Sequence, residues 1–412
     1  MVAWSPAAAS AGPEAHLLGV DPRAQQTPEG VVVTTLLEVT VPRRVSEVTA
    51  PCAGRAGDAH LDCIADRLES AGALWAPAPW PAEAATLSVT IDGADVPGKT
   101  IGVSRWGEVQ TRPGVGTAWI VALDASSSMG PRYDEAKAIA AAFVDSLRPG
   151  DRVDVVAFGD GIVADSRWLR DKAQARAFLD GLGRTFPARG RTRPLANILA
   201  RAASGALRDL DPAGPVHQAM VVLSNGAAGL DAGSTPAGAL ELRSRLTEGR
   251  WSRDNRVAPR RPVPVISVWL AGRQVDELGA GSREFMEDLA NTEIGGFFDV
   301  VRDGQAARAP RIVTAVRDRF DRMLVVRWRV PRLAATLDQT LKVTFPGVEP
   351  PVVGDTWSNV PLSTDPGPTG VRVEAPARTT WTTWAAVGAA LTLAAAMAVA
   401  VARRRPKQRR TG

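Results

Sequence analysis

Asp124, Ser126 and Ser128 carry oxygen-bearing side chains at alternating positions directly after the apolar segment 119–123. Carboxylate and hydroxyl oxygens are the ligands that hard cations such as Mg²⁺ and Ca²⁺ prefer. The apolar segment predicts a buried strand, and a helix is predicted to follow over 132–147. Open α/β sheets bind their ligands at the carboxyl ends of their strands, so these three side chains lie where a ligand would be held.

Strands and helices alternate from residue 117 onward, which predicts a parallel sheet with helices on both faces. The predicted strands are 118–124, 152–158, 217–224 and 263–270. The predicted helices are 132–147, 171–182, 194–208, 236–248, 283–292 and 304–320. The fold class expected for this part of the chain is therefore α/β.

The spacing Asp-x-Ser-x-Ser over 124–128, followed by Met-Gly, resembles the signature of von Willebrand factor type A (vWA) domains. Residues 147–158 look like the family's first helix end and second strand, and 289–298 look like its late helix and Gly-Gly turn. The resemblance covers roughly residues 116–320 and is to bacterial membrane-anchored vWA proteins. It implies a Rossmann-like vWA fold with a metal-ion-dependent adhesion site at Asp124, Ser126 and Ser128.

A loop threonine before a helix is the second segment of the site that the resemblance implies. Residues 190–197 are similar to the family's Gly-Thr loop, which assigns this role to Thr192. On sequence alone, Thr192 can equally be the cap of a helix that begins at Pro194. Both interpretations stay open at this point.

The third segment departs from the family pattern, because Asn225 stands where these domains usually have an aspartate. The implied ligands then carry one formal negative charge, and arginines at 189, 191 and 193 weaken the attraction for a cation further. Two outcomes follow. Either Mg²⁺, Mn²⁺ or Ca²⁺ binds and an Asp or Glu of a protein ligand completes its coordination, or no metal binds and the domain is a metal-independent scaffold for envelope complex assembly.

Segments on both sides of the α/β region predict β structure. Strands are expected at 31–41 and 86–91, and again at 323–330 and 340–345. The resemblance implies that the later strands pair with the earlier ones. The expected architecture is thus a vWA domain, 116–320, inserted into a β-sandwich built from an N-terminal β domain and C-terminal strands, namely 12–115 and 321–360.

An uncharged segment, 385–402, is followed by a basic tail, 403–412. As a helix this segment would be about 27 Å long, close to the ~30 Å of bilayer hydrocarbon. Tryptophans at 381 and 384 flank it, so a transmembrane helix is predicted over 381–402. The alternative is an Ala-rich helix in solution, which would have no polar face to turn to water.

The charge pattern predicts the topology. Basic residues stay in the cytoplasm, which leaves the N-terminal part outside it and makes the chain a single-pass membrane protein. Residues 1–11 look like the remnant of a signal peptide, with a disordered leader as the alternative. A Pro/Thr/Gly-rich linker, 361–380, would connect the folded part to the membrane.

Cys52 and Cys63 are the only two cysteines, and outside the cytoplasm they are expected to form a disulfide. Nucleic-acid binding is not expected. The formal net charge is +5, but six basic residues belong to the tail, and the chain before it has a net charge of −1. The folded part therefore has no basic excess for binding phosphates.

Residues 93–100 satisfy a phosphate-binding loop pattern, which makes a nucleotide-hydrolysing enzyme a third interpretation. That chemistry needs a helix directly after the loop, but residues 101–106 favour a strand. A serine hydrolase is not expected either, because residues 126–128 lack the Gly-x-Ser-x-Gly elbow. Protein binding without catalysis is the preferred interpretation.

Overall fold

The computed structural model describes the residues 12–21, 24–68, 73–81, 84–109, 116–183, 194–210, 217–227, 236–247, 262–270, 281–290, 294–300, 308–334 and 338–362. The chain divides into two compact units, Met1–Val371 and Arg372–Gly412, and every described residue belongs to the first. Thr192, the signal remnant 1–11, nearly all of the linker, the predicted transmembrane helix 381–402 and the tail lie outside the described residues. A search of the described part finds no helix with the length and apolar character needed to cross a bilayer.

A six-stranded sheet forms the α/β part, in the order β10-β9-β8-β11-β12-β13. Central strand β8 (Thr117–Asp124) is parallel to β9 (Arg152–Phe158) and β11 (His217–Ser224). Next come β12 (Val265–Leu270) and β13 (Gly296–Val300), also parallel, whereas β10 (Ile162–Asp165) forms an antiparallel edge. Every residue of β8 and β11 is buried, as expected for parallel strands covered on both faces.

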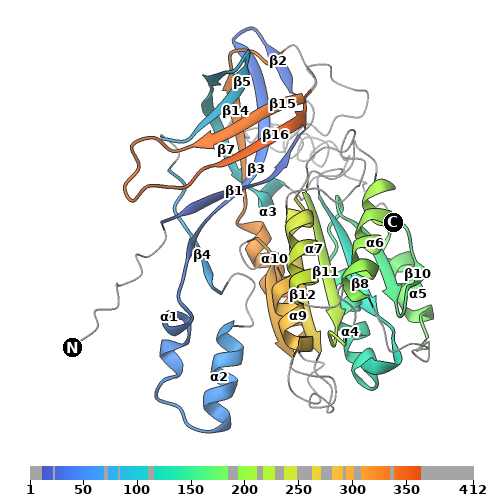
Figure 1. The fold of residues 1–412 in the computed structure, drawn as a ribbon. Coiled ribbons are helices and arrows are strands. Elements are labelled where there is room, and N and C mark those ends of the chain that lie inside the picture. Colours follow the sequence, from blue (N-terminus) through green and yellow to red (C-terminus); the bar gives the residue numbers. More distant parts are fainter. Residues whose placement is uncertain are drawn as a thin grey trace, which may run out of the picture. The chain divides into compact units, whose positions relative to one another are not determined.

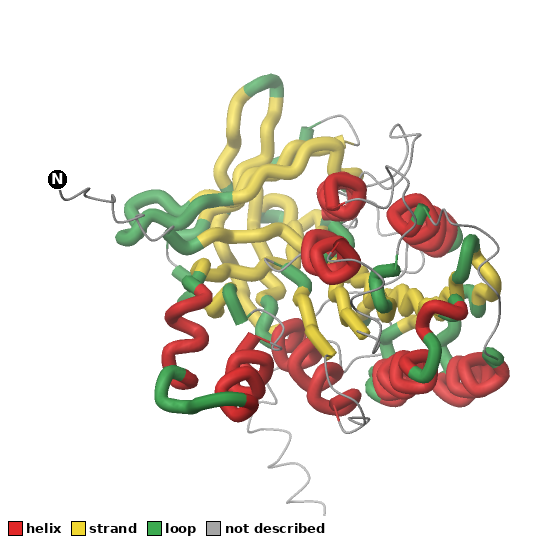
Figure 2. Tube along the Cα trace, turned by 60° about the horizontal axis from the view of Figure 1, so that its bottom comes forward, coloured by secondary structure: helices red, strands yellow, loops and turns green. Residues whose placement is uncertain are grey.

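Helices cover both faces of this sheet (Figures 1 and 2). One layer contains α4 (Arg132–Asp145), α5 (Lys172–Gly181) and α10 (Arg308–Asp321), and α4 contacts the other two. The other layer contains α6 (Leu195–Arg208), α7 (Pro236–Thr247) and α9 (Gly281–Leu289), with α7 between its neighbours. The mixed α/β fold expected from the sequence is thus confirmed, and each helix predicted between residues 132 and 320 is present with ends shifted by a few residues.

Two further sheets come from both flanks of the α/β part. The first has the order β1-β3-β14-β7, formed by β1 (Glu14–Val20), β3 (Gly30–Pro42), β14 (Leu324–Val330) and β7 (Lys99–Arg105), with β2 (Gln25–Thr27) and β4 (Trp75–Pro77) also paired to β3. The second has the order β16-β15-β5-β6, formed by β16 (Asp355–Pro361), β15 (Asp338–Thr344), β5 (Thr86–Ile91) and β6 (Ala94–Pro97). Strand β14 therefore pairs with strands that precede the α/β part, as does β15.

One apolar core joins these two sheets. It includes Leu37 from before the α/β part and Trp328 and Val343 from after it, all fully buried. The indole Nε1–H of Trp328 donates a hydrogen bond to Thr35 at 2.8 Å, so even the polar edge of this large side chain is satisfied. The two flanks share a core, which means that neither could bury its apolar face alone.

The N-terminal flank is not wholly β, contrary to the sequence-based expectation. It contains α1 (Val45–Thr49), a 3₁₀ turn (Ala50–Cys52) and α2 (Asp58–Leu68). Cys52 and Cys63 form a disulfide that joins the turn to α2 (Cα–Cα 5.7 Å). A short helix, α3 (Trp106–Val109), follows β7.

The phosphate-loop pattern at 93–100 lies in β structure. Asp92 and Gly93 both have positive φ and form the turn between β5 and β6, and Lys99 begins β7. No helix begins directly after Thr100, because β7 continues to Arg105. The arrangement of helix N–H groups that holds phosphate in such loops is not formed by these residues.

Candidate functional site

The carboxyl edge of the α/β sheet brings two predicted site segments together. Leu123 of β8 lies opposite Leu223 of β11 in register, and both strands end one residue later, at Asp124 and Ser224. Parallel strands place their carboxyl ends at the same edge, so these polar residues meet there. Asp124, Ser224 and the following Asn225 are all buried.

Both carboxylate oxygens of Asp124 accept hydrogen bonds. Oδ1 accepts from the backbone N–H of Ser126 at 3.0 Å, and Oδ2 accepts from the hydroxyl of Ser224 at 2.6 Å. The Ser224 hydroxyl in turn accepts from the backbone N–H of Gly226 at 3.0 Å. This chain of bonds fixes the orientation of the carboxylate, and charge-assisted bonds of this kind are the stronger ones.

The two serines of the motif face each other. The Oγ atoms of Ser126 and Ser128 lie 2.7 Å apart, within hydrogen-bond distance. Ser126 is buried, whereas Ser128 is exposed and belongs to a 3₁₀ turn, Ser127–Met129. The pair therefore leads from the buried carboxylate toward solvent.

Asn225 ties the second strand's loop to the serine segment. Its amide Nδ2–H donates to the backbone carbonyl of Ser128 at 2.8 Å, while its Oδ1 accepts from Ala227 N–H at 2.9 Å. The backbone carbonyl of Asn225 accepts from the indole of Trp269 at 3.0 Å. The sequence suggested Asn225 as part of a metal site, and in the structure its side chain holds the serine segment in place.

Gly226 makes the close approach of this loop feasible. Its φ is +69°, and a Cβ at this position would lie 2.2 Å from the carbonyl oxygen of Ser282. Only glycine fits both the backbone conformation and the space. Glycine at position 226 is thus required by the local geometry.

The donor set fits a hard cation in type. It consists of one carboxylate and two hydroxyls, and the 2.7 Å between the serine oxygens is near the roughly 3 Å that separates adjacent ligands of an octahedral Mg²⁺. The charge is low, because Asp124 is the one acidic member. Throughout the described residues, no group of three or more His, Cys, Asp or Glu side chains could hold a metal, so any ion here depends on hydroxyls.

Thr192 and the neighbouring arginines lie in 184–193, outside the described residues. Their placement relative to Asp124 stays a prediction. Ser224 was missed as a site residue, although its position at the end of an apolar strand, directly before Asn-Gly, is the signal that could have identified it.

Residues 119–226 match the family model of the von Willebrand factor type A domain. The chain contains a vWA domain. The matched residues extend from β8 to the loop after β11, which includes every described residue of the site. Strands β12 and β13 and helix α10 continue the vWA-like fold beyond the matched residues.

Solved structures similar to this vWA protein have low identity and low TM-scores. A von Willebrand factor type A protein from Catenulispora acidiphila is 11% identical (TM-score 0.35, covering 89% of this chain and 77% of that one). An aerotolerance-related membrane protein from Bacteroides fragilis is 18% identical (0.34, 50% and 99%), and the vWF domain of the pili tip protein Mfa5 from Porphyromonas gingivalis is 12% identical (0.32, 50% and 97%). A search of curated proteins gives no match. The family match alone carries the assignment.

Proposed function

We propose that this chain binds a protein partner through the carboxyl edge of its vWA sheet. In this proposal, Asp124, Ser126 and Ser128, together with Thr192, hold Mg²⁺ or a similar divalent cation. An Asp or Glu carboxylate of the partner completes the coordination. The observation that carries the proposal is the placement of the buried Asp124 carboxylate beside two hydroxyls that lead to solvent.

The low charge of the site favours a partner that supplies an anion. A divalent cation beside one carboxylate keeps a net positive charge, which would attract a second carboxylate. The chain's own contribution is to fix its ligands beforehand, because Asp124 is held by Ser224 and by the Ser126 backbone. Such preorganisation reduces the entropy that binding would otherwise cost.

Calorimetric titration with Mg²⁺ and Mn²⁺ tests the metal. The wild-type chain should give saturable heat, and Asp124→Asn, which keeps the shape of the side chain and removes its charge, should abolish it. Ser128→Ala should weaken binding at least tenfold. Ser127→Ala is the matched control, because it removes a hydroxyl from the same turn at the position that the motif does not use. Equal heats for wild type and Asp124→Asn would reject the proposal.

A metal-independent scaffold for complex assembly is the second candidate, and the Asn225 amide favours it. The hydrogen bond from Asn225 to Ser128 joins the two loops without any cation. If this candidate is right, a partner identified by cross-linking binds equally well in EDTA and in Mg²⁺. If the first is right, EDTA abolishes that binding and Asp124→Asn has the same effect.

We also propose that residues 385–402 anchor the chain in a membrane, with the vWA domain outside the cytoplasm and the basic tail inside. The support is the uncharged segment followed by six basic residues. Protease added to intact cells should degrade the N-terminal part and spare an epitope placed after residue 412. An N-terminal part that is protected until lysis would contradict this topology.

A further inference from the structure

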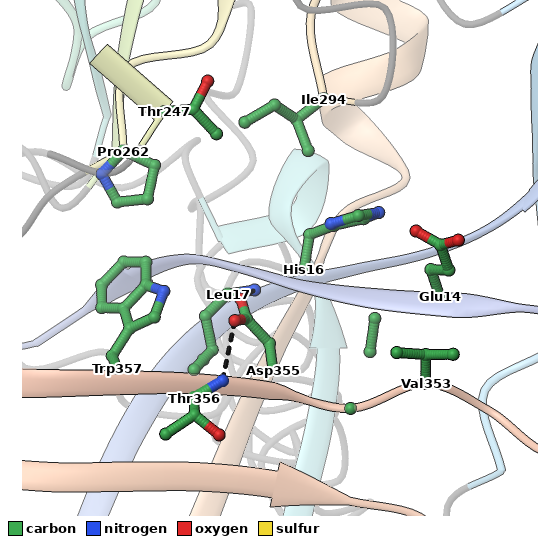
Figure 3. Close-up of a pocket in the computed structure, with 12 residues that line it drawn as sticks. Glu14, His16, Leu17, Thr247, Pro262, Ile294, Val353, Asp355, Thr356 and Trp357 are labelled. Atoms are coloured by element: carbon green, nitrogen blue, oxygen red, sulfur yellow. Dashed lines mark hydrogen bonds between the residues drawn. The ribbon is translucent and has the colours of Figure 1, made fainter. Parts of the chain in front are cut away.

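A cavity of about 300 Å³ is lined by residues that are distant in sequence from the vWA motif (Figure 3). One wall is formed by β1 and by the start of β16 with the residues just before it, and the other by residues 247, 262 and 294 of the vWA part. We propose that this cavity binds an organic cation, namely an ammonium or guanidinium group on a short hydrocarbon chain. Its volume is at the lower end of the range for small-molecule sites.

Asp355 is the main anionic group of the cavity. Its Oδ2 accepts from the backbone N–H of Leu17 at 2.8 Å, and its Oδ1 accepts from the N–H of Thr356 at 2.7 Å. Burial raises the pKa of this carboxyl, and these two donors, together with the side chain of Trp357, oppose the rise. Within the described part of the chain, no basic side chain forms an ion pair with Asp355. A bound cation would offset the cost of burying this charge.

His16 adds an acceptor to the same wall. Its Nε2 is buried and has no hydrogen-bond partner among the described residues. Burial, and then the nearby Arg319 guanidinium, lowers the pKa of His16 to about 4, so the ring is neutral at physiological pH. With its proton on Nδ1, the neutral ring presents a lone pair at Nε2. A ligand N–H would satisfy this buried atom, whose desolvation is otherwise uncompensated.

Glu14 also lines the cavity, and in Figure 3 its side chain rises from the same side of β1 as that of His16. The three side chains offer carboxylate oxygens and a neutral ring nitrogen, all of which accept hydrogen bonds. A ligand rich in N–H donors and carrying positive charge matches this set, whereas an anion would meet two carboxylates. A metal ion is a poorer match, since no group of suitable ligands exists among the described residues.

The remaining lining suits a short hydrocarbon chain. Trp357, Leu17, Pro262 and Ile294 contribute apolar surface around the polar groups. Trp357 is 7% exposed, and a cation placed over an indole ring gains further attraction. The cavity thus combines an acidic end with apolar walls.

Arg319 connects the two walls. Its guanidinium donates to both oxygens of Glu38, at 3.1 and 3.0 Å, and to the carbonyl of Gly295 at 2.7 Å. Glu38 is the register partner of His16 across β3 and β1, and Gly295 follows Ile294 in the chain. The charge of Arg319 is therefore matched by Glu38, and Asp355 remains the lining carboxylate without an ion pair among the described residues.

The cavity lies at the opposite end of the vWA sheet from Asp124. Pro262 precedes β12 and Ile294 precedes β13, and both strands run parallel to β8, which has Asp124 at its carboxyl end. A strand of six residues spans about 20 Å. Binding in the cavity and metal binding at the serines are therefore separate events.

Calorimetry with n-butylguanidinium tests the proposal on the full chain in detergent. Its matched control is n-butylurea, which has the same shape without the charge. The cation should bind with a stoichiometry of one, and the urea should bind at least tenfold more weakly. Equal affinity for both compounds, or no heat with either, would overturn the proposal.

Two variants locate the site. Asp355→Asn keeps an acceptor for Leu17 and should weaken n-butylguanidinium binding at least tenfold, and Glu14→Gln should weaken it less. Asp180→Asn is the charge control, because it removes the same charge from the exposed end of α5. A loss of the same size in Asp180→Asn would show a general charge effect and reject the cavity. Asp124→Asn should leave this binding unchanged.

Discussion

Asp154 gives the sharpest prediction of how stability depends on pH. It is a buried residue of β9, beside Asp165 of edge strand β10. Burial, with the Asp165 carboxylate adding to it, raises the pKa of Asp154 from 3.8 to about 7, and the hydroxyl of Ser166 and the charge of Arg167 oppose this only in part. The folded protein therefore keeps a proton on Asp154 at pH values where the unfolded chain has released it.

The sign of the effect follows from this difference. Between about pH 4 and pH 7 the folded state binds more protons than the unfolded state, so the free energy of unfolding falls as the pH rises. The rise of the Asp154 pKa from 3.8 to about 7 corresponds to at most about 4 kcal/mol at pH 8. Asp154→Asn removes the titration and keeps an acceptor for the Ser166 hydroxyl, which lies 3.4 Å from Asp154. The variant is expected to be more stable than wild type at pH 8.

Urea denaturation at pH 4 to 8 measures this, with circular dichroism as the signal. The difference between wild type and Asp154→Asn should be small at pH 4 and should grow to several kcal/mol at pH 8. Asp180→Asn, on the exposed end of α5, should follow the wild-type profile. A constant difference across this range, or a variant that is less stable at pH 8, would refute the reasoning.

Three other variants should lower stability, each measurable by urea denaturation. Glu38→Gln leaves the buried guanidinium of Arg319 without its carboxylate and should cost about 3 to 5 kcal/mol, whereas a loss below 1 kcal/mol would contradict a buried ion pair. Replacing Cys52 and Cys63 by serine opens a loop of 11 residues and should cost about 3 kcal/mol, and dithiothreitol should remove the difference from wild type. Gly226→Ala should cost about 1 to 3 kcal/mol and reduce Mg²⁺ binding, because the φ of this residue is +69° and the space for a Cβ is occupied. A Gly226→Ala variant as stable as the wild type would rule out the described loop.

The central strands could be predicted because a strand that is buried on both faces has a continuous run of apolar residues. The segment before Asp124 is a continuous apolar run, and so is the segment before Ser224. Strand β10 has no such run, because it lies at the sheet edge, where Ile162 and Val163 are exposed. Helix α2 was missed, although the helical spacing of Leu61, Ile64 and Leu68 is the signal that could have identified it.

The candidate site was predictable in part. The spacing of Asp124, Ser126 and Ser128 follows from their order in one segment, and the parallel register brings Ser224 beside them. The contact between Asn225 and Ser128 was not predictable, because it depends on which atom of a side-chain amide faces a backbone carbonyl 97 positions away. Composition and spacing identify atoms that can bind a cation, but they do not say which atoms already bind one another.

Asn225 connects the two candidate functions physically. A carboxylate at this position would add a negative charge for a cation, but it has no proton to donate and would face the carbonyl oxygen of Ser128. The amide has the opposite properties, since it holds the serine segment and adds no charge. In a domain with an aspartate here, a cation would have to balance that repulsion, whereas this chain assembles the same loops without one. The site is therefore preorganised before any ion arrives, and a bound cation would depend more on a carboxylate that a partner brings.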